Sequence, residues 1–104
     1  MDLIRALEAQ LARGPDTAVL RFSLGNACLK QGNPDRAIAH LKRATELDPD
    51  YSAAWKLLGR AQSDASLTEE AVRTYEHGIV VAERRGDIQA AKEMRVFLKR
   101  LQRL

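Results

Sequence analysis

Two consecutive segments decide the fold: residues 18–51, AVLRFSLGNACLKQGNPDRAIAHLKRATELDPDY, and residues 52–85, SAAWKLLGRAQSDASLTEEAVRTYEHGIVVAERR. A shift of 34 residues places the second segment under the first, and small and apolar side chains then coincide. The coinciding pairs are Leu24 with Leu58, Gly25 with Gly59, Ala27 with Ala61, Asp35 with Glu69, Ala37 with Ala71, Ile38 with Val72, Leu41 with Tyr75, and Ala44 with Gly78. A fixed period of this kind indicates an array of stacked structural repeats.

Helix-breaking residues divide both segments and their flanks. Asp16 follows a Gly-Pro pair and is expected to cap the next helix. Asn33 is expected to cap a helix with Pro34 in its first position, where a missing N–H costs nothing. Ser66-Leu67-Thr68-Glu69 has the pattern of a capping box, and Gly86-Asp87 is a stop followed by a new cap. Six helices are therefore expected, over about 2–13, 17–31, from Pro34 to the break at 48–50, 52–64, from the 66–69 box to about 85, and from 88 to near the end.

No segment alternates with a period of two residues, so the predicted fold class is all-α without a sheet. Short connections between helices imply antiparallel neighbours. Gly25, Gly59, Ala37 and Ala71 have almost no side chain and would let paired helices approach closely where they cross. A large residue at Ala37 or Ala71 would overpack that crossing at a cost of about 1–3 kcal/mol.

This pattern resembles the tetratricopeptide repeat (TPR), which uses a tryptophan-like residue, Leu-Gly, a tyrosine, an alanine, an aromatic residue, a second alanine and a closing proline. The first segment supplies Leu24-Gly25, Ala37, Leu41, Ala44 and Pro49, and the second supplies Trp55, Leu58-Gly59, Ala71, Tyr75 and Gly78. The sequence departs from the pattern at Arg21 (tryptophan place), Cys28 and Gln62 (tyrosine place), and Glu83 (proline place). Because Glu83 replaces the closing proline, the last helix of the second segment is expected to run long.

The resemblance implies a right-handed α-α superhelix in a single domain. Residues 1–16 would form an N-terminal capping helix, residues 18–51 the first repeat, residues 52–85 the second, and residues 86–104 a C-terminal capping helix. The last helix carries apolar residues on one face and basic residues elsewhere, as capping helices of such arrays do.

Charge and composition restrict the class of protein. Net charge is +3, and residues 84–104 hold seven basic and two acidic side chains. The N-terminus lacks the basic and apolar run of a secretory signal, and no uncharged stretch approaches the roughly 20 residues that span a bilayer. The single cysteine, Cys28, excludes an internal disulfide. We expect a cytoplasmic protein without membrane contact.

Catalytic and metal-binding patterns are absent from the sequence. His40 and His77 fall at places expected to face solvent, without further ligands at metal-site spacing. Cys28 lies on the expected buried side of its helix, with no histidine patterned to activate it. No glycine-rich phosphate loop occurs. The sequence therefore predicts a non-enzyme with no cofactor and no metal.

The resemblance further implies that the first helix of each repeat lines a concave groove. The groove candidates are Val19, Phe22, Asn26, Leu29, Lys30, Ala53, Lys56, Arg60, Ser63, Ala90, Met94 and Phe97. Of these, Phe22, Leu29 and Phe97 lie beside the expected core stripes. They predict a docking module for a protein or peptide, and the cations Lys30, Lys56 and Arg60 make an acidic peptide or a terminal carboxylate a candidate partner. The alternative is that Phe22, Leu29 and Phe97 pack against neighbouring helices and that the cations form an ordinary solvated face.

Some TPR proteins hold chaperone tails with a five-residue carboxylate clamp, and only Asn26 matches that set. Phe22, Leu57, Asp87 and Ala91 stand in its other places, so no such clamp is expected. Two other functions stay open. The basic C-terminal helix could bind nucleic acid or another acidic surface, although Phe97 is its one aromatic residue and nucleic acid is the less favoured partner. The terminal helices could pair two copies through Leu101 and Leu104, or Leu3 and Leu7, although a monomer is favoured.

Overall fold

The computed structural model describes residues 2–103, and this part of the chain forms six helices and no strand. The helices are α1 (Leu3–Arg13), α2 (Ala18–Lys30), α3 (Pro34–Leu47), α4 (Ser52–Asp64), α5 (Thr68–Arg85) and α6 (Ile88–Gln102). They confirm the all-helical prediction and its element order. Leu104, a candidate for pairing two copies, lies outside the described residues.

Polar caps fix several helix starts. Asn33 accepts a hydrogen bond from the Arg36 N–H at 3.3 Å, with Pro34 in the first turn, and Asp87 accepts one from the Ala90 N–H at 3.2 Å. Both caps were predicted. The predicted cap of α2 is wrong, because Thr17 takes this role by accepting from the Leu20 N–H at 3.2 Å. Asp16 and Thr17 are adjacent and both can cap, so the tertiary contacts of Asp16 decide between them.

Asp16 instead joins two helices through arginines. One carboxylate oxygen accepts from Arg21 Nε at 2.7 Å, and the other accepts from Arg43 Nε at 3.0 Å. Arg21 lies on α2 and Arg43 on α3, so the carboxylate ties the first repeat together at the start of α2. These charge-assisted bonds, above all that from Arg21, lower the pKa of Asp16 from 3.8 to about 2.

We expect Asp16→Asn to destabilise the fold at neutral pH and to have a shrinking effect in acid. The folded-state pKa of Asp16 is lowered, so its contribution is complete above the unfolded value of 3.8 and is lost as pH falls through about 2. Urea unfolding of wild type and D16N at a series of pH values measures this. The two free energies of unfolding should converge near the acid end, and a difference that is independent of pH would contradict the assignment.

The predicted capping box at residues 66–69 is also wrong. The N-cap of α5 is Leu67, without a side-chain hydrogen bond, and Ser66 has a left-handed backbone with φ of 63°. Ser66 N–H donates to Ser63 O at 3.0 Å and Leu67 N–H to Gln62 O at 2.8 Å, which is the pattern that closes a helix C-terminus. Ser66 thus ends α4, in the place that Gly32 takes after α2 one repeat earlier.

Small residues let the paired helices nest, as predicted. A Cβ atom at Gly25 would lie 2.5 Å from Leu41 Cγ, and one at Gly59 would lie 2.4 Å from Tyr75 Cε1. A third contact of this kind joins α5 to α6, where a Cβ at Gly78 would lie 2.6 Å from Met94 Sδ. Real Cβ atoms do not come this close to other heavy atoms, so these crossings depend on the missing side chain.

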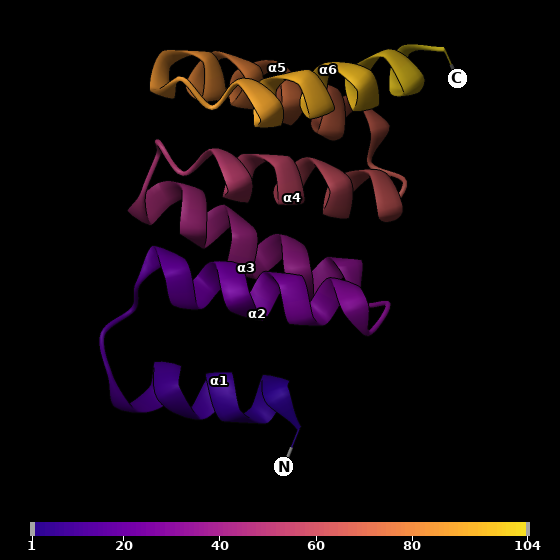
Figure 1. The fold of residues 1–104 in the computed structure, drawn as a ribbon. Coiled ribbons are helices and arrows are strands. Elements are labelled where there is room, and N and C mark those ends of the chain that lie inside the picture. Colours follow the sequence, from indigo (N-terminus) through magenta and orange to yellow (C-terminus); the bar gives the residue numbers. More distant parts are fainter. Residues whose placement is uncertain (1, 104) are drawn as a thin grey trace.

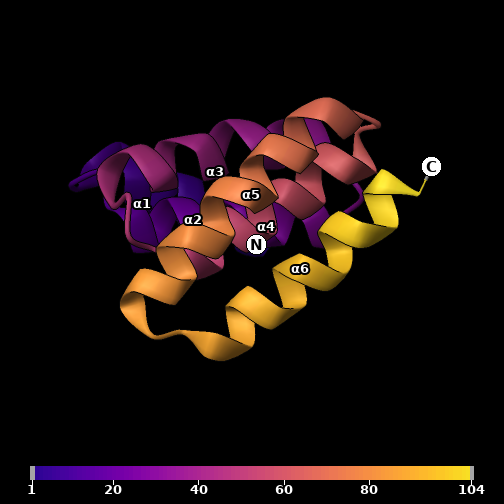
Figure 2. The same cartoon turned by 90° about the horizontal axis from the view of Figure 1, so that it is seen from above.

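The helices stack in chain order, from α1 at one end to α5 and α6 at the other (Figure 1). Packing is densest between α2 and α3, α4 and α5, and α5 and α6, with α3 against α4 joining the repeats. Seen from above, α6 diverges from α5 beyond the turn that joins them (Figure 2). The core forms two clusters. One is built from residues of α1, α2, α3 and α4, and the other from residues of α5 and α6. The largest fully buried side chains are Leu24, Leu41, Met94, Val81 and Cys28.

Candidate docking surface

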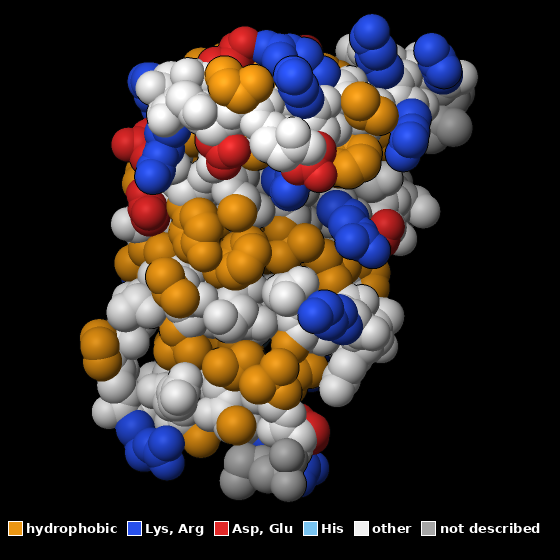
Figure 3. Space-filling model, in the orientation of Figure 1, with side chains coloured by type: hydrophobic (Ala, Val, Ile, Leu, Met, Phe, Trp, Pro, Cys, Tyr) orange, Lys and Arg blue, Asp and Glu red, His pale blue; other side chains and the backbone are white. Residues whose placement is uncertain are grey.

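Helices α2, α4 and α6 share one face of the stack, which is turned toward the viewer in Figure 1 with α5 passing behind α6. They are the first helices of the two repeats and the C-terminal helix, and α4 contacts both α2 and α6. The space-filling view of this face shows apolar side chains gathered in a band between α2 and α4 (Figure 3). The predicted groove candidates are distributed over these three helices.

We define the apolar strip as Phe22, Leu29, Tyr51 and Leu57. All four are partly exposed, and Phe22, Leu29 and Leu57 also pack against the buried core. The rings of Phe22 and Tyr51 stack with centroids 5.1 Å apart, which links α2 to the residue that precedes α4. These side chains are therefore held in fixed positions by the core while part of their apolar surface stays accessible.

The predicted cations of the groove differ in their exposure and in whether they form ion pairs within the molecule. Lys30 is exposed at the end of α2. Lys56 is bound, because its Nζ donates to Glu93 Oε1 at 3.0 Å and so joins α4 to α6. Arg60 is 68% exposed, and its one ion pair among the described residues is a long contact of 4.0 Å with Asp64. The positive charge available to a partner therefore comes from Lys30 and Arg60 more than from Lys56.

The other predicted residues have mixed positions. Val19 is 65% exposed, and Asn26 is partly exposed in the middle of α2. The prediction that Met94 lines the groove is wrong, because Met94 is fully buried against Gly78 and cannot touch a partner. Phe97 is partly exposed, and its ring centroid lies 5.8 Å from that of Tyr75.

The position of Met94 follows from the length of α5. Leu47, where α3 ends, corresponds to Val81 one repeat later, but α5 continues to Arg85. The extra turn was expected from Glu83 in the proline place. It also moves the start of α6 to Ile88, later than a 34-residue period from the start of α4 at Ser52 would place it. Met94 corresponds in sequence to Asn26 and Arg60, which are accessible, but the shifted helix turns it into the core.

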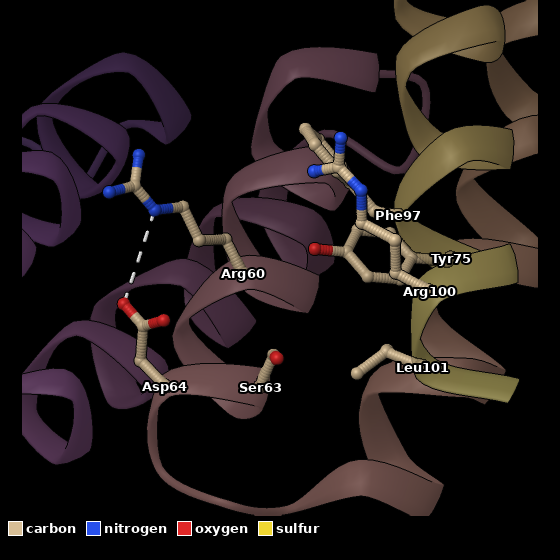
Figure 4. Close-up of a pocket in the computed structure, with 7 residues that line it drawn as sticks. All are labelled: Arg60, Ser63, Asp64, Tyr75, Phe97, Arg100 and Leu101. Carbon is tan, nitrogen blue, oxygen red and sulfur yellow. Dashed lines mark ion pairs between the residues drawn. The ribbon is translucent and has the colours of Figure 1, made fainter. Parts of the chain in front are cut away.

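A pocket of about 300 Å³ opens between α4 and the C-terminal half of α6 (Figure 4). Its walls are Arg60, Ser63, Asp64, Tyr75, Phe97, Arg100 and Leu101. Sequence reasoning named Arg60, Ser63 and Phe97 as groove residues but missed Asp64, Tyr75, Arg100 and Leu101. The sequence places Tyr75 at the crossing with Gly59, Arg100 in the basic C-terminal helix and Leu101 among the residues that could pair two copies, but none of them in the groove.

Tyr75 serves both the crossing and the pocket. Its ring packs on Gly59 and the residue is 2% exposed, while in the close-up its hydroxyl points to the side of Arg60 (Figure 4). Burial raises the pKa of Tyr75 to about 12, Asp64 adds to this rise, and Arg60 opposes it. The phenol therefore stays protonated at neutral pH and can donate a hydrogen bond into the pocket.

The clamp positions hold groups that are already engaged or apolar. Asp87 accepts a hydrogen bond from Ser52 Oγ at 2.7 Å, and this bond, with that of the Ala90 N–H, lowers the pKa of Asp87. Ala91 is buried against α5. Asp87 therefore fixes the start of α6 to α4.

The histidines and the cysteine lie apart from this face. His77 is exposed and its ring lies 4.3 Å from that of Trp55. His40 is partly buried, contrary to the predicted solvent position, with Nδ1 3.1 Å from Arg21 Nη1, and burial lowers its pKa. Cys28 is fully buried, as expected, and burial raises the pKa of its thiol. Between Asp2 and Arg103, no three His, Cys, Asp or Glu side chains gather as a metal site would require.

The basic residues of α6 are exposed around the helix rather than collected with aromatic residues. Lys92, Lys99, Arg100 and Arg103 are exposed, and Arg95 is paired with Glu83. Of this set, Arg100 alone lines the pocket. No helix of the described residues combines the length and the apolar character needed to cross a membrane.

Known proteins share this architecture. A family model described as tetratricopeptide repeat matches residues 18–61. The chain is 48% identical over 101 residues to the TPR repeat-containing protein PA0015 of Pseudomonas aeruginosa, which covers 97% of this chain and 96% of that protein. The solution structure of protein BPP2914 from Bordetella parapertussis superposes with a TM-score of 0.87 at 41% identity, over 99% of this chain and 90% of that one.

A more distant structure shares the fold alone. The TPR2B domain of yeast Sti1, solved as a complex described as TPR2B-domain:pHsp70, gives a TM-score of 0.89 at 20% identity, over 96% of this chain and 80% of that one. The nested Gly25 and Gly59 crossings, the helix stack and these relatives agree in one conclusion: the chain belongs to the tetratricopeptide repeat family.

Proposed function

We propose that this protein is a non-catalytic docking module that binds a peptide or protein segment across the α2–α4–α6 face. The observation that carries the proposal is the apolar strip, in which four partly exposed side chains are held in place by the core and the Phe22–Tyr51 stack. Apolar surface of this kind, bordered by polar and charged groups, is typical of protein interaction sites. Helices fixed by nested crossings supply a rigid surface, so little ordering entropy opposes binding.

The charges beside the strip favour an acidic or neutral segment. Lys30 and Arg60 are exposed, and Glu93 is paired with Lys56. Asp87 keeps its negative charge, but both of its carboxylate oxygens already accept hydrogen bonds, from Ser52 Oγ and the Ala90 N–H. A partner carrying acidic residues would approach a surface of complementary sign. TPR domains commonly act as protein-interaction modules, and the Sti1 domain was solved with a segment described as pHsp70.

Selection from a phage-displayed library of random peptides tests the proposal. Selected peptides should shift the amide signals of α2, α4 and α6 in two-dimensional ¹H–¹⁵N NMR spectra and leave those of α3 and the outer side of α5 unchanged. We expect Asn26→Trp, which places an indole across the middle of the face, to weaken binding by about tenfold or more.

Glu76→Trp is the matched control, because Glu76 is exposed on α5, away from the face. It should bind the selected peptides as wild type does, and thermal melts should show both variants folded. Peptides that map to α3 and α5, or that bind N26W and E76W equally well, would contradict the proposed surface.

A further inference from the structure

The pocket between α4 and α6 offers two kinds of contact within one small volume. Tyr75, Phe97 and Leu101 give it an apolar wall, and the tilted Tyr75–Phe97 pair holds the aromatic part in place. Arg60 of α4 and Arg100 of α6 also line it, and in the close-up the Arg100 guanidinium lies above the Tyr75 ring while that of Arg60 extends to the opposite side, toward Asp64 (Figure 4). Its volume of about 300 Å³ suits one or two side chains rather than a folded element.

The guanidinium groups of this pocket have little competition within the molecule. Arg60 meets Asp64 only at 4.0 Å, and Arg100 has no ion pair or side-chain hydrogen bond among residues 2–103. No hydrogen bond within the same range engages the Tyr75 hydroxyl, which the close-up shows on the Arg60 side of the pocket (Figure 4). Three donors are thus available to an acceptor that enters from solvent.

The charge balance favours a single negative charge. Two arginines and one aspartate, Asp64, line the pocket, so its lining carries a net charge of +1. Asp64 would repel a phosphate dianion about twice as strongly as a carboxylate, and a carboxylate can still bind guanidinium groups and accept from the phenol. The apolar wall adjacent to these donors would be covered by an apolar side chain of the same ligand.

We propose that this pocket binds an internal peptide segment in which a Glu or Asp is followed, two residues later, by a large apolar side chain. In an extended chain, residues two apart point to the same side, so the carboxylate reaches Arg60 and Arg100 while the apolar group covers Phe97 and Leu101. The inference rests on the proposed docking function and specifies the partner's chemistry at one end of the docking surface.

The test is an NMR titration with the blocked peptide acetyl-Gly-Glu-Gly-Phe-Gly-amide and two counterparts, one with Gln for Glu and one with Ala for Phe. Up to about 10 mM peptide would detect dissociation constants in the millimolar range. We expect shifts at Arg60, Tyr75, Phe97 and Arg100, and an affinity for the Glu–Phe peptide about tenfold higher than for either counterpart. The variant R60A/R100A should abolish the preference for Glu over Gln, and Y75F should reduce it.

The variant R13A/K92A is the matched control, since it removes two exposed cations that do not line the pocket. It should keep the full preference. Equal binding of the Glu and Gln peptides, a preference that survives in R60A/R100A, stronger shifts with inorganic phosphate, or no shifts at the highest concentration would each overturn the pocket assignment. If library-selected peptides still bind the α2–α4–α6 face with unchanged affinity in R60A/R100A, the pocket assignment fails and the docking function stands.

Discussion

Replacing Leu41 by Ala should remove about 2–5 kcal/mol of the free energy of unfolding. Leu41 is fully buried on α3 and covers Gly25 of α2 at the crossing of the first repeat. Its loss leaves a cavity at a place where neighbouring backbone cannot move in, because α2 and α3 are also held by the Asp16 contacts with Arg21 and Arg43. A domain of this size has a total stability of roughly 5–15 kcal/mol, so this single change consumes much of it.

Urea unfolding followed by circular dichroism measures the effect of L41A. Lys42→Ala is the control, since Lys42 is the exposed next residue of the same helix, and we expect it to change the free energy of unfolding by about 0.5 kcal/mol or less. An L41A variant as stable as K42A would show that the crossing does not support the fold.

Replacing Met94 by Glu should release α6 from the stack. Met94 is fully buried among α5 residues, and a carboxylate there would find no cation within the apolar cluster of Ala71, Tyr75 and Ala82. Loss of the thioether packing costs about 2–5 kcal/mol, and burial of an unpaired polar group adds to it. The chain can avoid the second cost only by exposing the site, so the amides of α6 should lose their protection from hydrogen exchange.

Val96→Glu is the control for this experiment, since Val96 is 46% exposed two residues along the same helix. It should leave exchange rates and stability close to those of wild type. If M94E folds with full protection of α6 and loses only peptide binding, Met94 belongs to the docking surface, as the sequence predicted, and its placement in the core is wrong.

The fold could be predicted because its determinants are local and repeat. Gly25 and Gly59 mark the crossings, and the stops at Gly32 and Gly86 mark the turns. Local sequence does not fix a cap where two adjacent residues can both serve, as Asp16 and Thr17 can before α2. The prediction for Ser66 is wrong because a serine three residues before a glutamate has the spacing of a capping box, whereas here Ser66 takes the left-handed position that usually favours glycine.

The docking surface was harder to predict, because it depends on which side of each helix faces the core once the helices have packed. A repeat period places Met94 with Asn26 and Arg60, but the extra turn of α5 changes which side of α6 faces the core. The same shift brings Arg100 and Leu101 beside Arg60 and Tyr75. Side chains 40 residues apart in sequence thus form one pocket, which no local pattern could indicate.

Nesting of paired helices at small residues is the central claim, since the docking face exists only if these crossings set the spacing of α2, α4 and α6. A double-mutant cycle between Gly25→Ala and Leu41→Ala tests it most directly. In wild type the added methyl group meets Leu41 Cγ at 2.5 Å, so overpacking of about 1–3 kcal/mol should outweigh or cancel the roughly 1 kcal/mol that alanine gains over glycine in a helix.

With Leu41 already shortened, the same methyl group enters the cavity without a clash. The account therefore predicts that Gly25→Ala stabilises the L41A protein while it destabilises wild type or leaves it unchanged, with a coupling free energy of about 1–3 kcal/mol. An identical effect of Gly25→Ala in both backgrounds would contradict it.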